Sequence, residues 1–193
     1  KIIFLFMGLT CFSCQKEMPP IKEPCVEFET ITDTVTKVLV YEKKDWPEGY
    51  GMATKINSLT WFKAVGFIYE NKSLMGIKLL SVDSDNNLAE DISISNFKVI
   101  SGCYVVTSTN LSERTKVYAD YCSHYGDVVI DEYVLDTTAI NKIELVQIDT
   151  INKVLEGNFA ISFVNANKRP KRNPFEPNKI RLFNGYFKGV YYE

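Results

Sequence analysis

Apolar and polar residues alternate along most of the chain after its first fifty positions. The alternation is clearest in Ile92–Ser95 and Ile143–Ile148, and it indicates strands with one buried face, because every second side chain of a strand points to the same side. The sequence lacks a window with the apolar period and capping residues of a helix. We predict strands over residues 51–56, 60–69, 74–82, 91–100, 102–108, 115–122, 127–135, 142–148, 155–164 and 179–191, with one or two further extended segments within 26–41.

Many short strands separated by Asn, Asp, Gly and Pro predict an all-β domain. We expect an antiparallel β-sandwich or a sandwich-like, partly open barrel, preceded by a lipoprotein signal and a short tether. The chain has 193 residues, of which 46% are hydrophobic and 13% aromatic. That is enough for one core, and aromatic residues favour strands. No repeat or second boundary divides the sequence, so we predict a single domain over residues 26–193.

The first residues read as a targeting segment. Lys1 precedes the apolar run Ile2–Leu9, and the chain becomes polar after Cys14. A basic start, a short apolar stretch and small residues before a cut are the parts of a secretory signal peptide. The run is too short for a membrane span, and a buried N-terminal strand is the alternative. No initiator Met is present, so we expect an N-terminally truncated signal peptide over residues 1–13.

Ser13 and Cys14 resemble the cut site of a lipoprotein signal, where the cysteine after the cut is acylated. Cys11 is a minor competitor for that position. Several acyl chains on Cys14 would anchor the protein stably, since a single chain binds membranes only marginally. Residues 14–25, which hold three prolines, then form a flexible tether. We expect a lipoprotein of the outer membrane that faces the periplasm or the cell surface.

Export permits disulfide bonds. Cys103 and Cys122 fall on two strand-like runs with a polar turn, residues 110–114, between them. If these runs form a hairpin, the two cysteines face each other, and a bridge would stabilise the fold by about 3 kcal/mol. Cys25 would then be the odd thiol. Three unpaired buried thiols are the alternative, because connectivity cannot be read from spacing.

Charge and histidine content argue against several classes of protein. Lys and Arg number 22 against 24 Asp and Glu, a net charge of −2, whereas a nucleic-acid binder carries a basic excess. His124, the single histidine, lies near Cys122 but lacks the paired ligand spacing of a zinc site. Nucleophilic catalysis needs a base beside a Ser or Cys, and His124 is the only base of that type in the sequence. We therefore expect no metal, no cofactor and no catalysis. A glycan hydrolase with two carboxylates stays the alternative, because the fold sets that pair.

Two features suit binding. A proline-containing basic loop between the last two predicted strands can engage phosphate or carboxylate groups; the alternative is a solvated loop that blunts a sheet edge. Trp46 and Tyr50 share a turn-rich loop and could stack on a sugar ring, although packing is the alternative. The basic residues of the loop are Lys168, Arg169, Lys171 and Arg172.

Four short stretches stand out in the predicted strands. They are Ala53–Trp61, Gly102–Tyr104, the stretch Leu155–Phe163, which resembles a G-x-F-x-F strand, and the N-G-x-F stretch Asn184–Phe187. In order and spacing they resemble a family of Bacteroidota lipoproteins with a C-terminal β-domain of unknown function, although Ser58 stands where the family has Gly. The resemblance implies an envelope-anchored β-domain and no established activity.

These observations predict a non-catalytic binding or interaction module of the cell envelope. Its partners would be the membrane, through the anchor, and a glycan, an anionic envelope polymer or a surface protein. A cryptic glycan hydrolase and a purely structural surface protein are the alternatives. A cleft with two carboxylates about 5–10 Å apart would favour the hydrolase.

Overall fold

The structure, a computed structural model, describes residues 25–26, 49–55, 58–69, 73–168 and 170–192. These residues form strands and turns without a helix. The alternation predicts each strand, with ends that differ by three residues at most. The predicted signal peptide, Cys14, most of the tether, the predicted extended segments within 26–41 apart from Val26, and Trp46 lie outside the described residues. The strands are β1 (Tyr50–Lys55), β2 (Ser58–Tyr69), β3 (Leu74–Val82), β4 (Leu88–Lys98), β5 (Gly102–Ser108), β6 (Val117–Tyr125), β7 (Val128–Leu135), β8 (Lys142–Asp149), β9 (Val154–Asn165) and β10 (Lys179–Tyr192).

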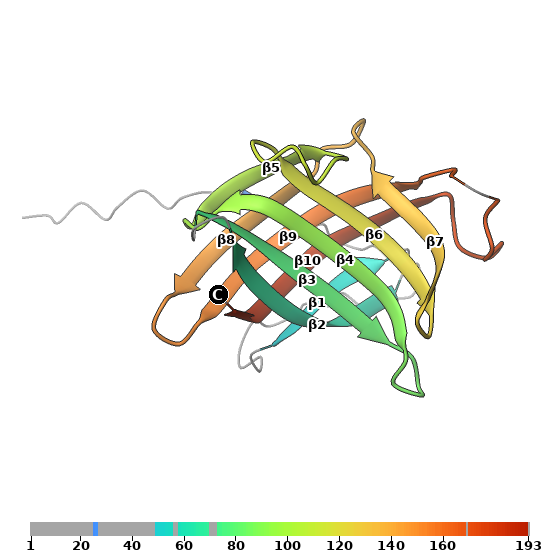
Figure 1. Ribbon diagram of the computed structural model, residues 1–193, viewed down its shortest axis with the longest axis horizontal. Helices are drawn as coiled ribbons and strands as arrows, with labels where there is room; N and C mark the ends of the chain where they lie inside the picture. The colour runs from blue at the N-terminus through green and yellow to red at the C-terminus, as the bar shows by residue number, and fades with distance from the viewer. Residues whose placement is uncertain (1–24, 27–48, 56–57, 70–72, 169, 193) are drawn as a thin grey trace, which may run out of the picture.

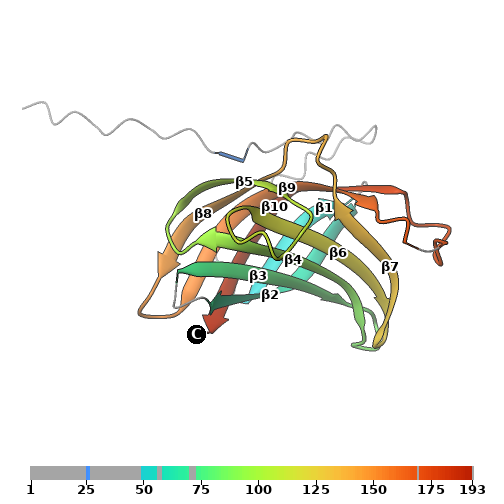
Figure 2. The same cartoon turned by 45° about the horizontal axis from the view of Figure 1, so that its top comes forward.

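Hydrogen bonds join all ten strands into one curved sheet (Figure 1). The order runs β1-β10-β2-β3-β4-β6-β5-β8-β9-β7, and further pairings join β1 to β2, β9 to β10 and β6 to β7. The sheet thus curls back on itself, with β3, β4 and β6 crossing in front of β9 and β10 (Figures 1 and 2). Each strand has two or more hydrogen-bonded neighbours.

The all-β, sandwich-like fold that the sequence predicts is confirmed, with one difference. The sheet is mixed, because β10 pairs with β2, and β5 with β6, in parallel. Both parallel contacts are short, and the other pairings are antiparallel. Local alternation predicts where strands lie, but it carries no information on their relative direction.

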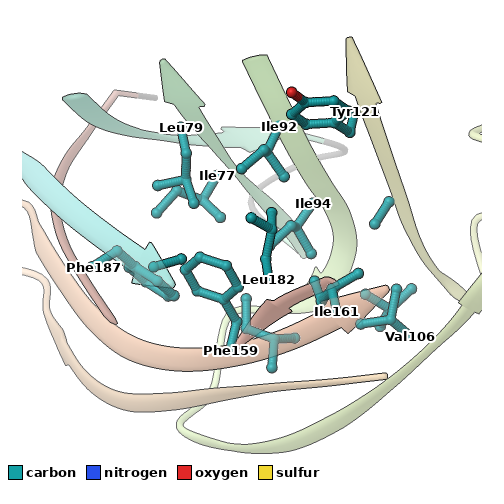
Figure 3. Close-up of a cluster of buried hydrophobic side chains, with 14 of the residues drawn as sticks. Ile77, Leu79, Ile92, Ile94, Val106, Tyr121, Phe159, Ile161, Leu182 and Phe187 are labelled. Atoms are coloured by element: carbon teal, nitrogen blue, oxygen red, sulfur yellow. The ribbon is translucent and has the colours of Figure 1, made fainter. Parts of the chain in front are cut away.

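The core lies between the two walls of the sheet. Inward side chains from β3 and β4, such as Ile77 and Ile94, face inward side chains from β9 and β10, such as Phe159 and Phe187 (Figure 3). All four are fully buried. Fully burying side chains of this size contributes about 1.5–3 kcal/mol each, so this layer supplies the main stabilisation of the fold.

Two of the sequence motifs meet inside this core. Gly185, in the N-G-x-F motif of β10, pairs with Phe159 in the Leu155–Phe163 stretch of β9. A Cβ atom on Gly185 would lie 2.6 Å from two atoms of the Phe159 ring. Glycine is therefore required at this position by close approach.

The cysteine pairing differs from the predicted one. Cys103 forms a disulfide with Cys25, with the two Cα atoms 5.7 Å apart, and Cys122 is a free thiol. The predicted hairpin fails because β5 and β6 touch in parallel. Both strands then advance in the same direction, so Cys103 at the start of β5 and Cys122 near the end of β6 are separated rather than opposed.

Among the described residues, no helix is long and apolar enough to cross a membrane.

Candidate functional site

A hollow of about 490 Å³ lies on the outer face of the sheet. Its floor consists of outward side chains from four neighbouring strands. The registers place them in two cross-strand rows, since Phe67 pairs with Gly76 and Ser95 with Tyr118, while Lys78 pairs with Ser93 and Ser93 with Asp120. The floor residues are Phe67 of β2, Gly76 and Lys78 of β3, Ser93 and Ser95 of β4, and Tyr118 and Asp120 of β6.

One wall of the hollow comes from the loop between β5 and β6, residues 109–116, which contributes Leu111 and Arg114. The loop lies beside β4 (Figure 2) because Asn96 holds it there. The Nδ2 group of Asn96 donates to the carbonyl oxygen of Leu111 at 3.1 Å and to that of Glu113 at 3.3 Å. Asn96 has a φ of 69°, a left-handed conformation that Asn adopts more readily than most residues.

We expect the substitution Asn96→Asp to loosen this loop. Aspartate tolerates the same backbone conformation but lacks the amide donor, so both bonds to the loop are lost at a cost of about 1–3 kcal/mol. Hydrogen exchange should then accelerate in residues 109–116 and stay unchanged in β9. Asn178→Asp, the same chemical change at an exposed position before β10, is the control and should leave exchange in residues 109–116 unchanged. Unchanged exchange in the 109–116 loop of the Asn96 variant would contradict this anchoring.

The carboxyl group of Asp120 is the most unusual polar group of the hollow. Tyr118 and Ser93 hydrogen-bond to it, yet its Oδ1 atom is buried without a hydrogen-bond partner among the described residues. Desolvation raises the pKa of Asp120, and the nearby charge of Asp91 raises it further. A buried acceptor without a partner is costly, so a ligand that donates a hydrogen bond here would remove that cost.

Asp91 sits beside Asp120 in a strip of charged groups on the same face. Its Oδ2 atom lies 3.3 Å from Lys78 Nζ and 3.2 Å from His124 Nε2. The other ring nitrogen of His124, Nδ1, is buried and lacks a partner in the described structure. The side chain of Lys78 therefore forms an ion pair with Asp91 of the strip and also lines the floor of the hollow.

Cys122 is next to this strip, opposite Asp91 and Glu132 in the register. Burial, followed by the charges of Asp91 and Asp120, raises the pKa of Cys122 to about 12. The thiolate is the nucleophilic and metal-binding form, so this residue stays a protonated thiol at neutral pH. Within the described part of the chain, no three His, Cys, Asp or Glu side chains group as metal ligands.

The predicted basic loop is held against β7. Lys168 Nζ lies 2.7 Å from Glu132 Oε2, and the backbone amides of Arg172 and Asn173 donate to the two carboxylate oxygens of Asp131 at 2.9 and 3.0 Å. Lys171 is half-buried, whereas Arg172 is exposed. Arg169 lies outside the described residues. Asp131 and Glu132 thus fix the loop in place. The loop therefore has a structural role, and the predicted ligand binding stays a prediction.

The structure does not bring Tyr50 to this loop. Tyr50 is 48% exposed at the start of β1, while the other end of β1, at Lys55, contacts Glu176 of the loop. The strand rise separates the two ends of β1 by roughly 16 Å. Tyr50 and the basic loop therefore do not form one binding surface, and Trp46 lies outside the described residues.

Sequence reasoning missed the hollow because its floor is assembled from four strands by their registers, which alternation does not predict. Phe67 and Asp120 meet only through the registers of β2, β3, β4 and β6. The one local signal was the unusual run of polar outward positions on β4 and β6, such as Ser93, Ser95 and Asp120.

A second polar cluster surrounds the side-chain ammonium group of Lys55. Lys55 is buried, and its Nζ atom contacts Glu90, Tyr121 and Glu176. The ammonium group lies 5.3 Å from the centre of the Tyr121 ring. The partners are 35, 66 and 121 residues away in sequence, so no motif could have predicted them.

Comparison with known proteins found no matching family model, curated protein or solved structure.

Proposed function

We propose that this protein is a non-catalytic glycan-binding module, and that the hollow on the outer face of β2, β3, β4 and β6 is its binding site. The observation that carries the proposal is the combination of groups in one hollow. Phe67 and Tyr118 supply aromatic surface, and Ser93 and Ser95 supply hydroxyl groups. Asp120 supplies a buried acceptor, Oδ1, which has no hydrogen-bond partner among the described residues. A sugar presents an apolar ring face together with many hydroxyl donors, and binding sites of this kind mix apolar surface with a few placed polar groups.

The location of the module rests on the sequence. Acylation of Cys14 would tether the domain to the outer membrane, facing the periplasm or the cell surface, as in the Bacteroidota lipoproteins that the motifs resemble. Glycans are abundant on both sides of that membrane, which agrees with the proposed ligand.

Replacement of Cys14 by alanine tests the anchor. We expect the variant to lose acyl chains and to move from the membrane fraction to the soluble fraction, because Cys14 is the residue that follows the predicted cut. Replacement of Cys11 by alanine is the matched control and should leave membrane retention intact. Continued acylation of the Cys14 variant would refute the assignment.

Replacement of Asp120 by alanine tests the binding site. We expect binding to an array of immobilised oligosaccharides, spanning neutral, amino and uronic residues, to weaken by about tenfold or more for the best ligand, the effect of one lost hydrogen bond to a charged or buried group. Asp127→Ala, an equivalent change in the exposed turn between β6 and β7, should not alter binding. If the wild-type protein binds no glycan of the array, or the Asp120 variant binds as the wild type does, the proposal fails.

Hydrolysis of a glycan is the second candidate, because Asp91 and Asp120 are diagonal neighbours on β4 and β6. Diagonal positions on adjacent strands are about 7–8 Å apart, within the range of a two-carboxylate hydrolase. Asp91, however, is engaged by Lys78 and His124 and does not line the hollow. We therefore favour binding. Release of reducing ends from a bound oligosaccharide, abolished by Asp91→Asn, would favour the hydrolase.

A further inference from the structure

The Phe67 ring forms a flat surface at one end of the hollow. Phe67 pairs with Gly76 across β2 and β3. A Cβ atom on Gly76 would lie 2.4 and 2.6 Å from two atoms of this ring, and 2.9 Å from Ser95 Oγ. The ring therefore packs directly on the backbone of β3, in space that only a glycine leaves open. Because Phe67 also lines the hollow, it presents a supported aromatic surface to a ligand.

Positive charge borders this surface on two sides. Arg114 reaches the hollow from the 109–116 loop, and Lys78 reaches it from the floor. Asp120 is the one carboxylate among the described lining residues, and one of its oxygens is buried without a partner. The hollow thus combines an aromatic platform, a hydrogen-bond acceptor for a hydroxyl group, and cations for an anionic group.

Resting on the proposed function, we infer that the hollow binds a uronic-acid residue of an acidic glycan, with the sugar ring against Phe67, the carboxylate at Arg114 and a ring hydroxyl donating to Asp120. A guanidinium group matches the geometry of a carboxylate, with two parallel hydrogen bonds. An amino sugar fits less well, because its ammonium group would meet Lys78 and Arg114. A neutral sugar would gain nothing from the charge of Arg114, whose Nη1 group also donates to Asn96 Oδ1 at 3.5 Å.

The charge in this inference is tested with a galacturonic-acid tetramer and its fully methyl-esterified form, which keeps the ring and removes the charge. We expect titration calorimetry on the wild-type protein to give about tenfold tighter binding of the acid form, and a difference that shrinks with salt. Arg114→Gln should abolish that difference and leave the affinity for the ester unchanged. Arg172→Gln, which removes an exposed arginine of the basic loop, is the matched control and should behave as the wild type.

The platform is tested with two substitutions. Phe67→Ala should weaken both probes by roughly tenfold through loss of the aromatic contact. Gly76→Ala should give the same loss although the ring is retained, because the added methyl group displaces it into the hollow. Phe175→Ala removes a ring that is 94% exposed in another loop and should change nothing. Circular dichroism and melting curves establish that each variant folds, and Phe67→Ala alone decides the test if Gly76→Ala does not fold.

The outcomes separate this inference from the proposed function. Equal affinity for the acid and the ester, with loss of both in Phe67→Ala, would overturn the acidic ligand and keep glycan binding in the hollow. Loss of acid binding in Arg172→Gln instead of Arg114→Gln would move the site to the basic loop and overturn the inference. Failure to bind either tetramer or any glycan of the array would overturn the inference and the proposed function together.

Discussion

Replacing Cys25 and Cys103 together by serine should lower the free energy of unfolding by about 4 kcal/mol. The bond closes a segment of 78 residues, and a cross-link of that span restricts the unfolded chain by about this amount. The bond ties Cys25, which precedes β1 in the chain, to Cys103 at the start of β5. For a domain of ordinary stability this is a large fraction of the total.

Urea unfolding of the double variant, monitored by tyrosine and tryptophan fluorescence, measures the effect. The wild-type protein in reducing buffer should match the double variant, because both lack the cross-link. Cys122→Ser is the control, since this thiol is free and half-buried, and it should cost less than 1.5 kcal/mol. A double variant as stable as the wild type would show that Cys103 carries no stabilising bond. An effect of Cys122→Ser as large as that of the double variant would show that Cys122 and not Cys25 is bonded to Cys103.

Replacing Lys55 by methionine should cost about 3–5 kcal/mol. Methionine has a similar length, so it fills the same space, but the change removes the charge that faces the carboxylates of Glu90 and Glu176. Removing one member of a buried ion pair leaves an uncompensated buried charge, and this has an effect of that size. Glu176 is the more sensitive partner, because its Oε2 atom is already buried without a partner in the described structure.

A double substitution isolates the charge effect. Lys55→Met combined with Glu90→Gln should recover part of the lost stability, because the second change removes one of the unpaired carboxylates. Lys63→Met, at an exposed position of β2, is the control and should stay within about 0.5 kcal/mol of the wild type. A Lys55 variant within 1 kcal/mol of the wild type would mean that water reaches this cluster and screens it.

The sequence predicts the strands well because alternation is a local property. Ile92 and Ile94 point inward and Ser93 and Ser95 outward, as their order indicates. Turn chemistry was equally readable: Asp83 accepts hydrogen bonds from the backbone amides of Asp85 and Asn87, so the Asp- and Asn-rich stretch between β3 and β4 forms a turn, as its composition indicates.

Pairing could not be predicted, because it depends on partners that are distant in the chain. Cys103 is bonded to a residue 78 positions before it, whereas hairpin reasoning considers only the next strand. Lys55 takes its role from residues on other strands for the same reason. The candidate binding residues were predicted from segments expected to be loops, where composition is conspicuous, and the hollow is made from ordinary residues on four strands.

The pairing of every described strand on both sides has a consequence for crowded surfaces. Among the described strands, a molecule that approaches side by side finds only parts of strands whose backbone amides and carbonyls lack a neighbouring strand, whereas a whole open edge strand is the usual starting point of fibril growth. A protein rich in strands can then reach high local density without polymerising, so long as the sheet stays closed between β9 and β10 and between β10 and β2. Variants that disrupt the pairing of β10 with β9 or with β2 should aggregate before they lose their secondary structure.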